Sequence, residues 1–367
     1  MPLRALVLAL ENYISAARLP KALRDGGFEV AVICYPSALV ALTKHVDRKE
    51  LIQPSDDAAR VASVMVSLIE NWGPRLVIPA DDRALRFLHH VVEVERFGRL
   101  PRVLIDLVKA SLPEPSAFCL ASDKRAASDF MAELGFPGPE WRPIVSVAEA
   151  RDFAAAYGFP VLLKPAEGRA GQGVQICMGE TDLASATLTD GDWVAQRYIA
   201  GVAAESSGIA WKGRLLGCIL YERFITDPPE IGPTCVAKII DHDTMAAGLA
   251  AFAKATRHNG FLSLGWILEE STRNANFLEV NARSVPIIGP SPKLGLNLCE
   301  CLWAKLTGSP RPKLDPNAPR LIALYPQELY RDPNSAYREH VLDEPFDDPE
   351  VHQAMQKGIE LIASGLA

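Results

Sequence analysis

The first part of the chain alternates apolar runs with segments in which apolar residues recur at helical spacing. The apolar, strand-like runs are Leu3–Leu10, Phe28–Cys34 and Arg75–Pro79. Helical spacing follows each of them, at 15–26, 56–72 and 82–93. Ser55 is the expected N-cap of the second helix, and Gly26-Gly27 is the expected end of the first. Strands that alternate with helices at this spacing predict a parallel α/β sheet over residues 1–110.

Beyond residue 110 the pattern changes to hairpins and longer strands. Ser111–Pro115 has the composition of a linker, and a helix is expected from Asp123 to Leu134. Two β-prone runs, Phe159–Leu163 and Val174–Cys177, enclose a glycine-rich turn and predict a β-hairpin. Other strands are expected at 192–199, 210–225, 234–240, 261–269 and 277–280, and other helices at 243–257 and 297–306. Residues 309–367 contain one clear strand, 321–325, and a final helix, and we expect them to pack on the core.

Composition narrows the class of protein. A chain of 367 residues suggests two or three domains at ~150 residues each. The net charge of −7, without a basic block, argues against a nucleic-acid partner. The apolar start of the chain is too short for a membrane span and lacks a signal-peptide cleavage site. The seven scattered cysteines fit a reducing cytoplasm, and we interpret Cys299 and Cys301 as buried thiols rather than a metal site.

The glycine-rich turn between the two β-prone runs has the composition of a phosphate site. Lys164 precedes it directly, and its glycines are Gly168, Gly171 and Gly173. Glycines let backbone N–H groups approach an anion, and lysine supplies the positive charge that phosphate needs. The turn has neither the Gly-Lys-Ser/Thr ending of a P-loop nor the glycine spacing of a dinucleotide-binding fold. A turn of this kind is by itself more often an ordinary hairpin turn, so a phosphate site needs a second, independent match.

A second polar pattern stands far downstream, in the strand-like run Asn276–Arg283. Alternation along a strand places Glu279, Asn281 and Arg283 on one face. A carboxylate and an amide oxygen two residues apart suit a hard cation such as magnesium. An arginine beside them suits an anionic substrate or a developing oxyanion.

Together the glycine hairpin and the Glu-x-Asn-x-Arg strand resemble the ATP-grasp superfamily of carboxylate–amine ligases. The pattern is similar to biotin carboxylase, carbamoyl-phosphate synthetase and D-alanine–D-alanine ligase. The resemblance covers residues 115–308 well and residues 1–110 by topology alone. It implies ATP and Mg²⁺ as cofactors, with Glu279 and Asn281 at the metal and Lys164 and Arg283 as catalytic residues. It also implies that ATP is held by Lys124, Lys164, Gly168, Gly171, Gly173, Gln196, Arg197, Ile199 and Glu205.

These roles follow the family pattern position by position. Lys124 matches a lysine that opens a helix and reaches a phosphate, and Arg197 and Ile199 match hinge residues whose backbone binds adenine. Gln196 stands where the family often has glutamate. Glu205 matches a carboxylate that often holds the ribose hydroxyls, and an ordinary surface glutamate is the alternative.

The resemblance implies an α/β fold that is α+β in its ATP-grasp part. A Rossmann-like pre-ATP-grasp domain, 1–110, would precede an ATP-grasp domain, 111–308, with a small lid at about 145–200, followed by the extension 309–367. The implied reaction is ATP-dependent activation of a small carboxylate as an acyl phosphate, which an amine or similar nucleophile then attacks. We expect a cytoplasmic protein without membrane or nucleic-acid partners, and a homodimer remains open.

One departure from the family keeps a second function open. Many members carry a further acidic or amide magnesium ligand upstream of the Glu-x-Asn motif, and that position here is Gly265. Glycine has no side chain to bind a metal, so a catalytically weakened ATP-binding protein is the alternative. A third possibility, an α/β oxidoreductase, is disfavoured because no glycine fingerprint follows the first strand.

The ends of the first and third predicted strands carry further polar residues. Ligands of open α/β sheets bind beyond the carboxyl ends of strands. Glu11, Asn12, Asp81 and Asp82 lie there and are candidates to contact the second substrate. For Asp81 and Asp82 the alternative is a helix cap.

Overall fold

The computed structural model describes residues 2–98, 100–165, 173–189, 191–229 and 232–363. Its N-terminal part is built on a four-stranded parallel sheet with strand order β3-β2-β1-β4. The strands are β1 (Leu3–Ala9), β2 (Phe28–Cys34), β3 (Arg48–Leu51) and β4 (Leu76–Pro79). The three strands that the apolar runs predict are present, and the exposed edge strand β3 is an addition to them.

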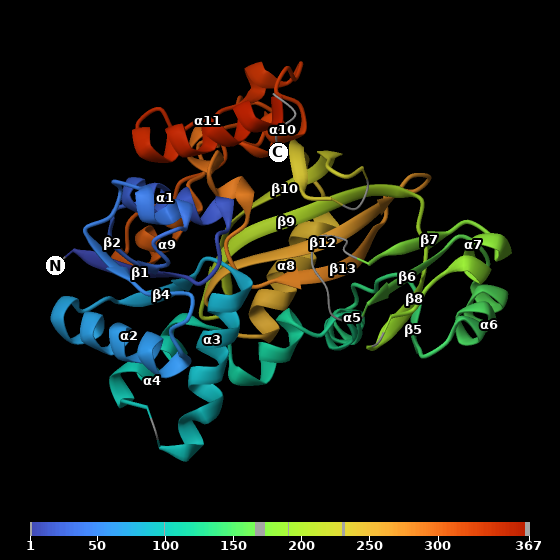
Figure 1. Cartoon of the computed structure of the whole chain (residues 1–367), viewed down its shortest axis with the longest axis horizontal. Helices are drawn as coiled ribbons and strands as arrows, with labels where there is room; N and C mark the ends of the chain where they lie inside the picture. The colour runs from blue at the N-terminus through green and yellow to red at the C-terminus, as the bar shows by residue number, and fades with distance from the viewer. Residues whose placement is uncertain (1, 99, 166–172, 190, 230–231, 364–367) are drawn as a thin grey trace.

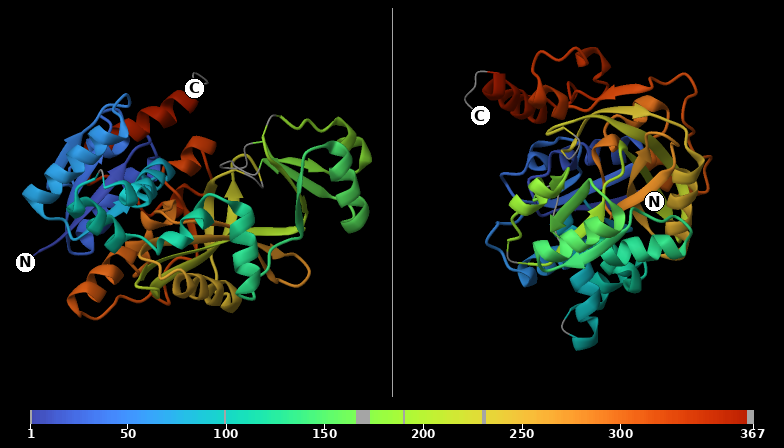
Figure 2. Two further views of the ribbon diagram at one scale, coloured as in Figure 1. Left: turned by 90° about the horizontal axis from the view of Figure 1, so that it is seen from below. Right: turned by 90° about the vertical axis from the view of Figure 1, so that its right-hand side faces the viewer.

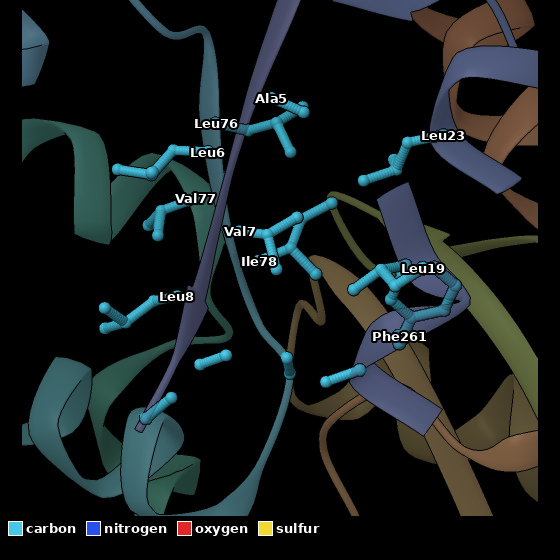
Figure 3. Close-up of a cluster of buried hydrophobic side chains, with 14 of the residues drawn as sticks. Ala5, Leu6, Val7, Leu8, Leu19, Leu23, Leu76, Val77, Ile78 and Phe261 are labelled. Atoms are coloured by element: carbon cyan, nitrogen blue, oxygen red, sulfur yellow. The ribbon is translucent and has the colours of Figure 1, made fainter. Parts of the chain in front are cut away.

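Helices cover this sheet and bury its central strands. They are α1 (Leu19–Asp25), α2 (Ala58–Trp72), α3 (Asp82–Glu93) and α4 (Arg102–Ser111), joined by 3-10 turns at Ile14–Ala17, Leu39–Leu42 and Val94–Phe97. Figure 3 shows side chains of β1 and β4 packed with Leu19 and Leu23 of α1 and with Phe261 from a strand of the next sheet. One continuous apolar core therefore joins the N-terminal sheet to the rest of the molecule.

A small antiparallel sheet forms a separate lobe, which stands away from the other sheets in Figures 1 and 2. Its strand order is β5-β8-β6-β7. The strands are β5 (Trp141–Ile144), β6 (Val161–Pro165), β7 (Gln175–Cys177) and β8 (Trp193–Arg197), and the helices are α6 (Val147–Tyr157) and α7 (Glu180–Ser185). The lobe has its own apolar core, around Phe153, Leu163 and Trp193. The predicted hairpin is β6–β7.

The largest sheet has six strands in the order β13-β12-β9-β10-β11-β14, and all its pairings are antiparallel. Its strands are β9 (Gly201–Trp211), β10 (Arg214–Thr226), β11 (Thr234–Ile239), β12 (Gly260–Glu269), β13 (Ala275–Asn281) and β14 (Leu321–Ala323). The turn between β9 and β10 contains Lys212 and Gly213, both at positive φ.

The two faces of this sheet have different surroundings. Leu264 and Trp266 point to the face covered by α5 (Lys124–Glu133) and α8 (Asp243–Ala255), which is apolar throughout. On the other face, Ile209 and Phe261 pack toward the N-terminal sheet and α9 (Leu298–Thr307). Further along the strands that second face becomes polar, and it is there that the candidate site lies.

The C-terminal segment returns to the N-terminal part of the chain. After the 3-10 turns Pro286–Ile288 and Ser291–Leu294, β14 pairs with β11, and α10 (Gln327–Arg331), the turn Arg338–His340 and α11 (Pro349–Ala363) follow. Figure 1 shows α11 beside the N-terminal helices. Thr43 Oγ1 donates a 2.5 Å hydrogen bond to Asp348, and Arg18 forms a buried ion pair with Asp343, at 3.7 Å. The last segment is therefore an integral part of the fold.

Some details differ from the pattern-based expectation. The cap of α2 is Asp57, which accepts the N–H of Arg60 at 2.8 Å, and not Ser55. The segment 15–26 divides into a 3-10 turn and α1, which begins at Leu19. Pro20 is the second residue of α1, and proline suits the first turn of a helix. Cys299 and Cys301 are buried free thiols, as predicted. Among the described residues, no helix has the length and apolar content needed to cross a bilayer.

Candidate functional site

The hairpin β6–β7 positions Lys164 beside the glycine-rich turn. Lys164 Nζ donates a 2.8 Å hydrogen bond to Oε1 of Gln196, which is buried on the neighbouring strand β8. Gly173 lies two residues before β7, at φ +76°, and a Cβ there would lie 2.9 Å from Pro165 Cγ, so both the conformation and the space require glycine. Gly168 and Gly171 lie outside the described residues.

The environment of Lys164 disfavours its charge. The pKa of Lys164 is lowered to about 8, mainly by burial and also by the like charge of Lys124, while Glu279 acts in the opposite direction. Among the described residues, the hydrogen-bond partner of its ammonium group is the neutral amide of Gln196, which cannot compensate the charge as a carboxylate would. Lys164 is therefore a cation that an incoming anion would stabilise.

Lys124 and Glu279 approach Lys164 from two other elements. Asp123 caps α5 by accepting the N–H groups of Arg125 and Ala126, so Lys124 is the first residue of the helix. Glu279 lies on β13, against which α5 packs. Three charges from α5, β6 and β13 thus influence one another, although they are far apart in the sequence.

The two predicted hinge residues, Arg197 and Ile199, lie at the end of β8 and just beyond it. The backbone N–H of Arg197 donates to the Glu140 carbonyl at 2.8 Å, and its guanidinium pairs with the Glu140 carboxylate. That N–H is therefore already used within the protein. Ile199 is buried, and among the described residues its N–H donates no hydrogen bond. Of the two predicted hinge amides, Ile199 has the one available to a ligand.

The register of the large sheet brings Glu279 and Glu205 to the same row. Gly265 of β12 lies opposite Glu279 of β13 on one side and opposite Glu205 of β9 on the other. In the next row, Ser263 lies between Asn281 and Ser207. Residues directly opposite on neighbouring strands project to the same face. Glu279, Asn281 and Glu205 therefore share the polar face of the sheet.

This donor set fits magnesium, which prefers carboxylate and amide oxygens and retains water. A Cβ at Gly265 would lie 3.0 Å from Glu279 Cγ, so the glycine keeps space open beside that carboxylate. Within the described part of the chain, no group of three or more His, Cys, Asp or Glu residues could hold a metal ion. The protein ligands would therefore be few, and phosphate oxygens and water would supply the others.

Arg283, just beyond β13, contacts the N-terminal sheet. Its Nε donates a 2.8 Å hydrogen bond to Asp82 Oδ1, and Nη1 donates to the Tyr13 hydroxyl at 3.3 Å. Its guanidinium also lies 5.0 Å from the centre of the Tyr13 ring. Burial opposes the charge, but Tyr13 and Asp82 outweigh burial and raise the pKa of Arg283. Arg283 is thus a fixed cation at the boundary between the two sheets.

The polar residues after β1 and β4 divide between structural and site roles. Asp81 caps α3 through Ala84 N–H at 2.8 Å and also accepts the N–H groups of Leu10 and Glu11, which confirms the capping alternative for Asp81. Asn12 accepts the N–H of Leu39 at 3.1 Å. Asp82 holds Arg283, and Glu11 lies 3.9 Å from Arg86. Sequence reasoning missed Tyr13, although it directly follows Glu11-Asn12.

Comparison of the sequence with known families and proteins finds similarity to carbamoyl phosphate synthases. Residues 123–195 match the family described as carbamoyl-phosphate synthase L chain, ATP binding domain. A segment of 110 residues is 32% identical to the mitochondrial arginine-specific large chain of carbamoyl phosphate synthase from Schizosaccharomyces pombe. That match covers 28% of this chain and only 10% of the relative, so it concerns one segment of a much longer protein.

Comparison of the structure with solved structures covers most of the chain. The biotin carboxylase domain of 2-oxoglutarate carboxylase from Hydrogenobacter thermophilus has a TM-score of 0.63 at 19% identity, over 87% of this chain and 71% of that one. N5-carboxyaminoimidazole ribonucleotide synthetase from Thermotoga maritima has a TM-score of 0.60 at 14% identity, over 86% and 78%. L-amino acid ligase from Bacillus licheniformis has a TM-score of 0.54 at 16% identity, over 85% and 75%.

Proposed function

We propose that this chain is an ATP- and magnesium-dependent ligase of the ATP-grasp superfamily that activates a small carboxylate or bicarbonate, as its match to an ATP-binding domain family and its fold support. The observation that carries this proposal is that Lys124 on α5 and Glu279 on β13 are near enough for their charges to shift the pKa of Lys164 on β6. Two cations and a carboxylate in this arrangement suit the phosphates of a nucleotide and its metal ion. The family match over residues 123–195 supports the same assignment.

The proposed reaction has two steps. A carboxylate oxygen attacks the γ-phosphorus of ATP, the bond to the bridging oxygen breaks, and ADP leaves, which gives an acyl phosphate. The nucleophile, an amine in the simplest case, then attacks the acyl carbon, loses a proton, and displaces inorganic phosphate. The work of the protein in both steps is positioning and charge stabilisation rather than covalent chemistry.

The described residues fit these steps. Lys164 and Lys124 hold phosphate oxygens, and the amide of Ile199 holds the adenine edge. Glu279 and Asn281 would hold magnesium, which would supply the positive charge that neutralises the phosphate oxygens. Arg283, fixed by Asp82 and Tyr13, would stabilise the charge that develops on the acyl oxygen.

In this proposal the small sheet β5–β8 acts as the lid over the nucleotide, and the N-terminal sheet carries the second substrate. The name of the Hydrogenobacter structure describes a dimer with MgADP and bicarbonate. A homodimer and a cytoplasmic location remain predictions for this chain.

The test is ATP turnover with a panel of amino acids, small carboxylates and bicarbonate. We expect one of them to raise ADP formation, and hydroxylamine to trap the acyl phosphate as a hydroxamate. Lys164→Met should abolish the reaction, whereas the exposed Lys305→Met on α9 is the matched control that should retain it. No ADP and no ATP binding by the wild-type protein would refute the proposal.

Gly265 supports a second candidate function, an ATP-binding protein with weakened catalysis, because it removes the side chain nearest to Glu279 on β12. ATP binding in calorimetry without hydroxamate formation for any compound in the panel would favour this second candidate.

A further inference from the structure

Gly265 lies between two carboxylates on the polar face of the large sheet. β12 is flanked by β13 and β9, and Gly265 lies directly opposite Glu279 on the first and Glu205 on the second. Opposed residues of neighbouring strands project to one face with their Cβ atoms about 5 Å apart. The two glutamates therefore stand on either side of a position without a side chain.

The space between these carboxylates exists only because residue 265 is glycine. A Cβ at this position would lie 3.0 Å from Glu279 Cγ and 3.8 Å from its Cδ. Any larger side chain would extend into the space beside the Glu279 carboxylate. Asn281, which is in the next row on the same face, adds an amide oxygen beside this gap. The arrangement gives two anionic groups and one neutral oxygen donor around an open position.

The Glu205 carboxylate is fixed by its neighbours through a single oxygen. Its Oε2 accepts the Tyr221 hydroxyl at 2.6 Å and the Ser263 hydroxyl at 3.2 Å. Ser263 is itself within 2.9 Å of the Ser207 hydroxyl, and the Tyr221 ring is buried. Among the described residues, nothing donates a hydrogen bond to Oε1. Outer-shell hydrogen bonds of this kind orient carboxylates that bind metals.

We infer that Glu205 is the second magnesium-facing carboxylate of the site, and that it supplies from β9 the negative charge that β12 lacks at Gly265. This inference rests on the proposed function, because it assumes that Glu279 and Asn281 hold the metal. It differs from the ribose-binding role that the family resemblance implies for Glu205. Loss of a carboxylate that binds the ribose would weaken ATP binding with or without metal. Loss of a metal-facing carboxylate would weaken only the metal-dependent part of binding.

The test measures metal and nucleotide binding separately. Mn²⁺ is titrated into the protein–ADP complex and followed by the loss of its free electron-paramagnetic signal. ADP affinity is measured in EDTA by calorimetry. Glu205→Gln, which keeps the shape and removes the charge, should weaken Mn²⁺ binding ~10–100-fold and leave ADP affinity in EDTA unchanged. Tyr221→Phe keeps both carboxylates and should give a smaller loss of Mn²⁺ affinity.

Other outcomes would overturn the inference. Unchanged Mn²⁺ binding in Glu205→Gln would do so, and so would an equal loss of ADP affinity in EDTA, which would return Glu205 to the ribose role. Glu205→Asp keeps the charge and serves if the glutamine variant does not fold, and it should bind Mn²⁺ better than Glu205→Ala. Wild-type protein that binds no ADP, or Glu279→Gln with wild-type Mn²⁺ affinity, would instead contradict the proposed function.

Discussion

The low pKa of Lys164 predicts that nucleotide binding depends on pH in a range where few other groups titrate. Lys164 has a pKa of about 8 in the free protein, against an ordinary value of 10.5. Bound phosphate stabilises the ammonium form and raises that pKa. Phosphate itself titrates near pH 6, below this range. Above pH 8, binding must therefore be accompanied by uptake of one proton at Lys164.

The size of the effect follows from the pKa. At pH 8 about half of the free protein carries neutral Lys164, so binding takes up about 0.5 proton, and at pH 9 about 0.9. Well above pH 8 the affinity for ADP or ATP should fall about tenfold per pH unit. The free energy of unfolding of the free protein should depend on pH with the opposite sign. Between pH 8 and 10.5 the unfolded chain binds more protons at Lys164 than the folded chain does, so this group makes stability rise with pH.

The assay is calorimetric titration of ADP at pH 7 to 9.5, in pairs of buffers that differ in ionisation enthalpy. The difference between buffers gives the number of protons taken up. Two variants sharpen the test. Lys164→Arg keeps its charge throughout and should show no uptake in this range. Gln196→Glu replaces the neutral partner by a carboxylate, so the pKa of Lys164 should rise and the fall in affinity should move to higher pH.

Wild-type protein without proton uptake at pH 8 to 9 would refute this reasoning. So would uptake that persists in Lys164→Arg, because the titrating group would then lie elsewhere.

Three other predictions follow from the site and from the C-terminal segment. Glu279→Gln should raise the magnesium concentration needed for ADP formation ~10-fold or more, and Asn281→Ala much less, because only the first removes a charge; equal shifts in a magnesium titration would contradict this. Gly265→Ala should also raise that concentration without changing the melting temperature, since its Cβ would lie 3.0 Å from Glu279 Cγ; an unaltered titration would count against it. Arg18→Met should cost ~3–5 kcal/mol of unfolding free energy at pH 8, by leaving the buried Asp343 without its cation. The loss should be smaller at pH 5, because burial raises the pKa of Asp343 to about 6 and protonation removes the charge; urea unfolding that gives the same loss at both pH values would be inconsistent with it.

The sequence predicts those elements whose signals are local. Helix α3 begins and ends as predicted, at Asp82 and Glu93, because Asp81 caps it and its apolar positions recur regularly. The strands β1, β2 and β4 are apolar runs that a buried parallel sheet requires. The exposed strand β3 carries the polar sequence Arg-Lys-Glu-Leu, without apolar alternation, so no local pattern could indicate it.

Contacts between residues that are far apart in the sequence cannot be predicted from local patterns. The motif predicts that Glu279 and Asn281 share a face, but the position of Glu205 depends on the pairing of β9 with β12, which no local pattern specifies. Asp82 was a candidate either to contact the second substrate or to cap a helix, and its ion pair with Arg283, 201 residues away in sequence, could not be predicted from a local pattern. The contact of Lys164 with the neutral Gln196 likewise depends on the pairing of β6 with β8, which no local pattern specifies.

The return of the C-terminal segment to the N-terminal sheet has a consequence for biosynthesis. Thr43 and its partner Asp348 are 305 residues apart, so at ~5–20 residues per second the ribosome needs roughly 15–60 s to supply the second after the first. During that interval the nascent chain carries Leu39 and Leu42 without the apolar cluster of Tyr325, Leu329, Val351 and Met355 that later covers them. The start of this protein is made first, and this apolar surface stays uncovered until the last segment has been synthesised.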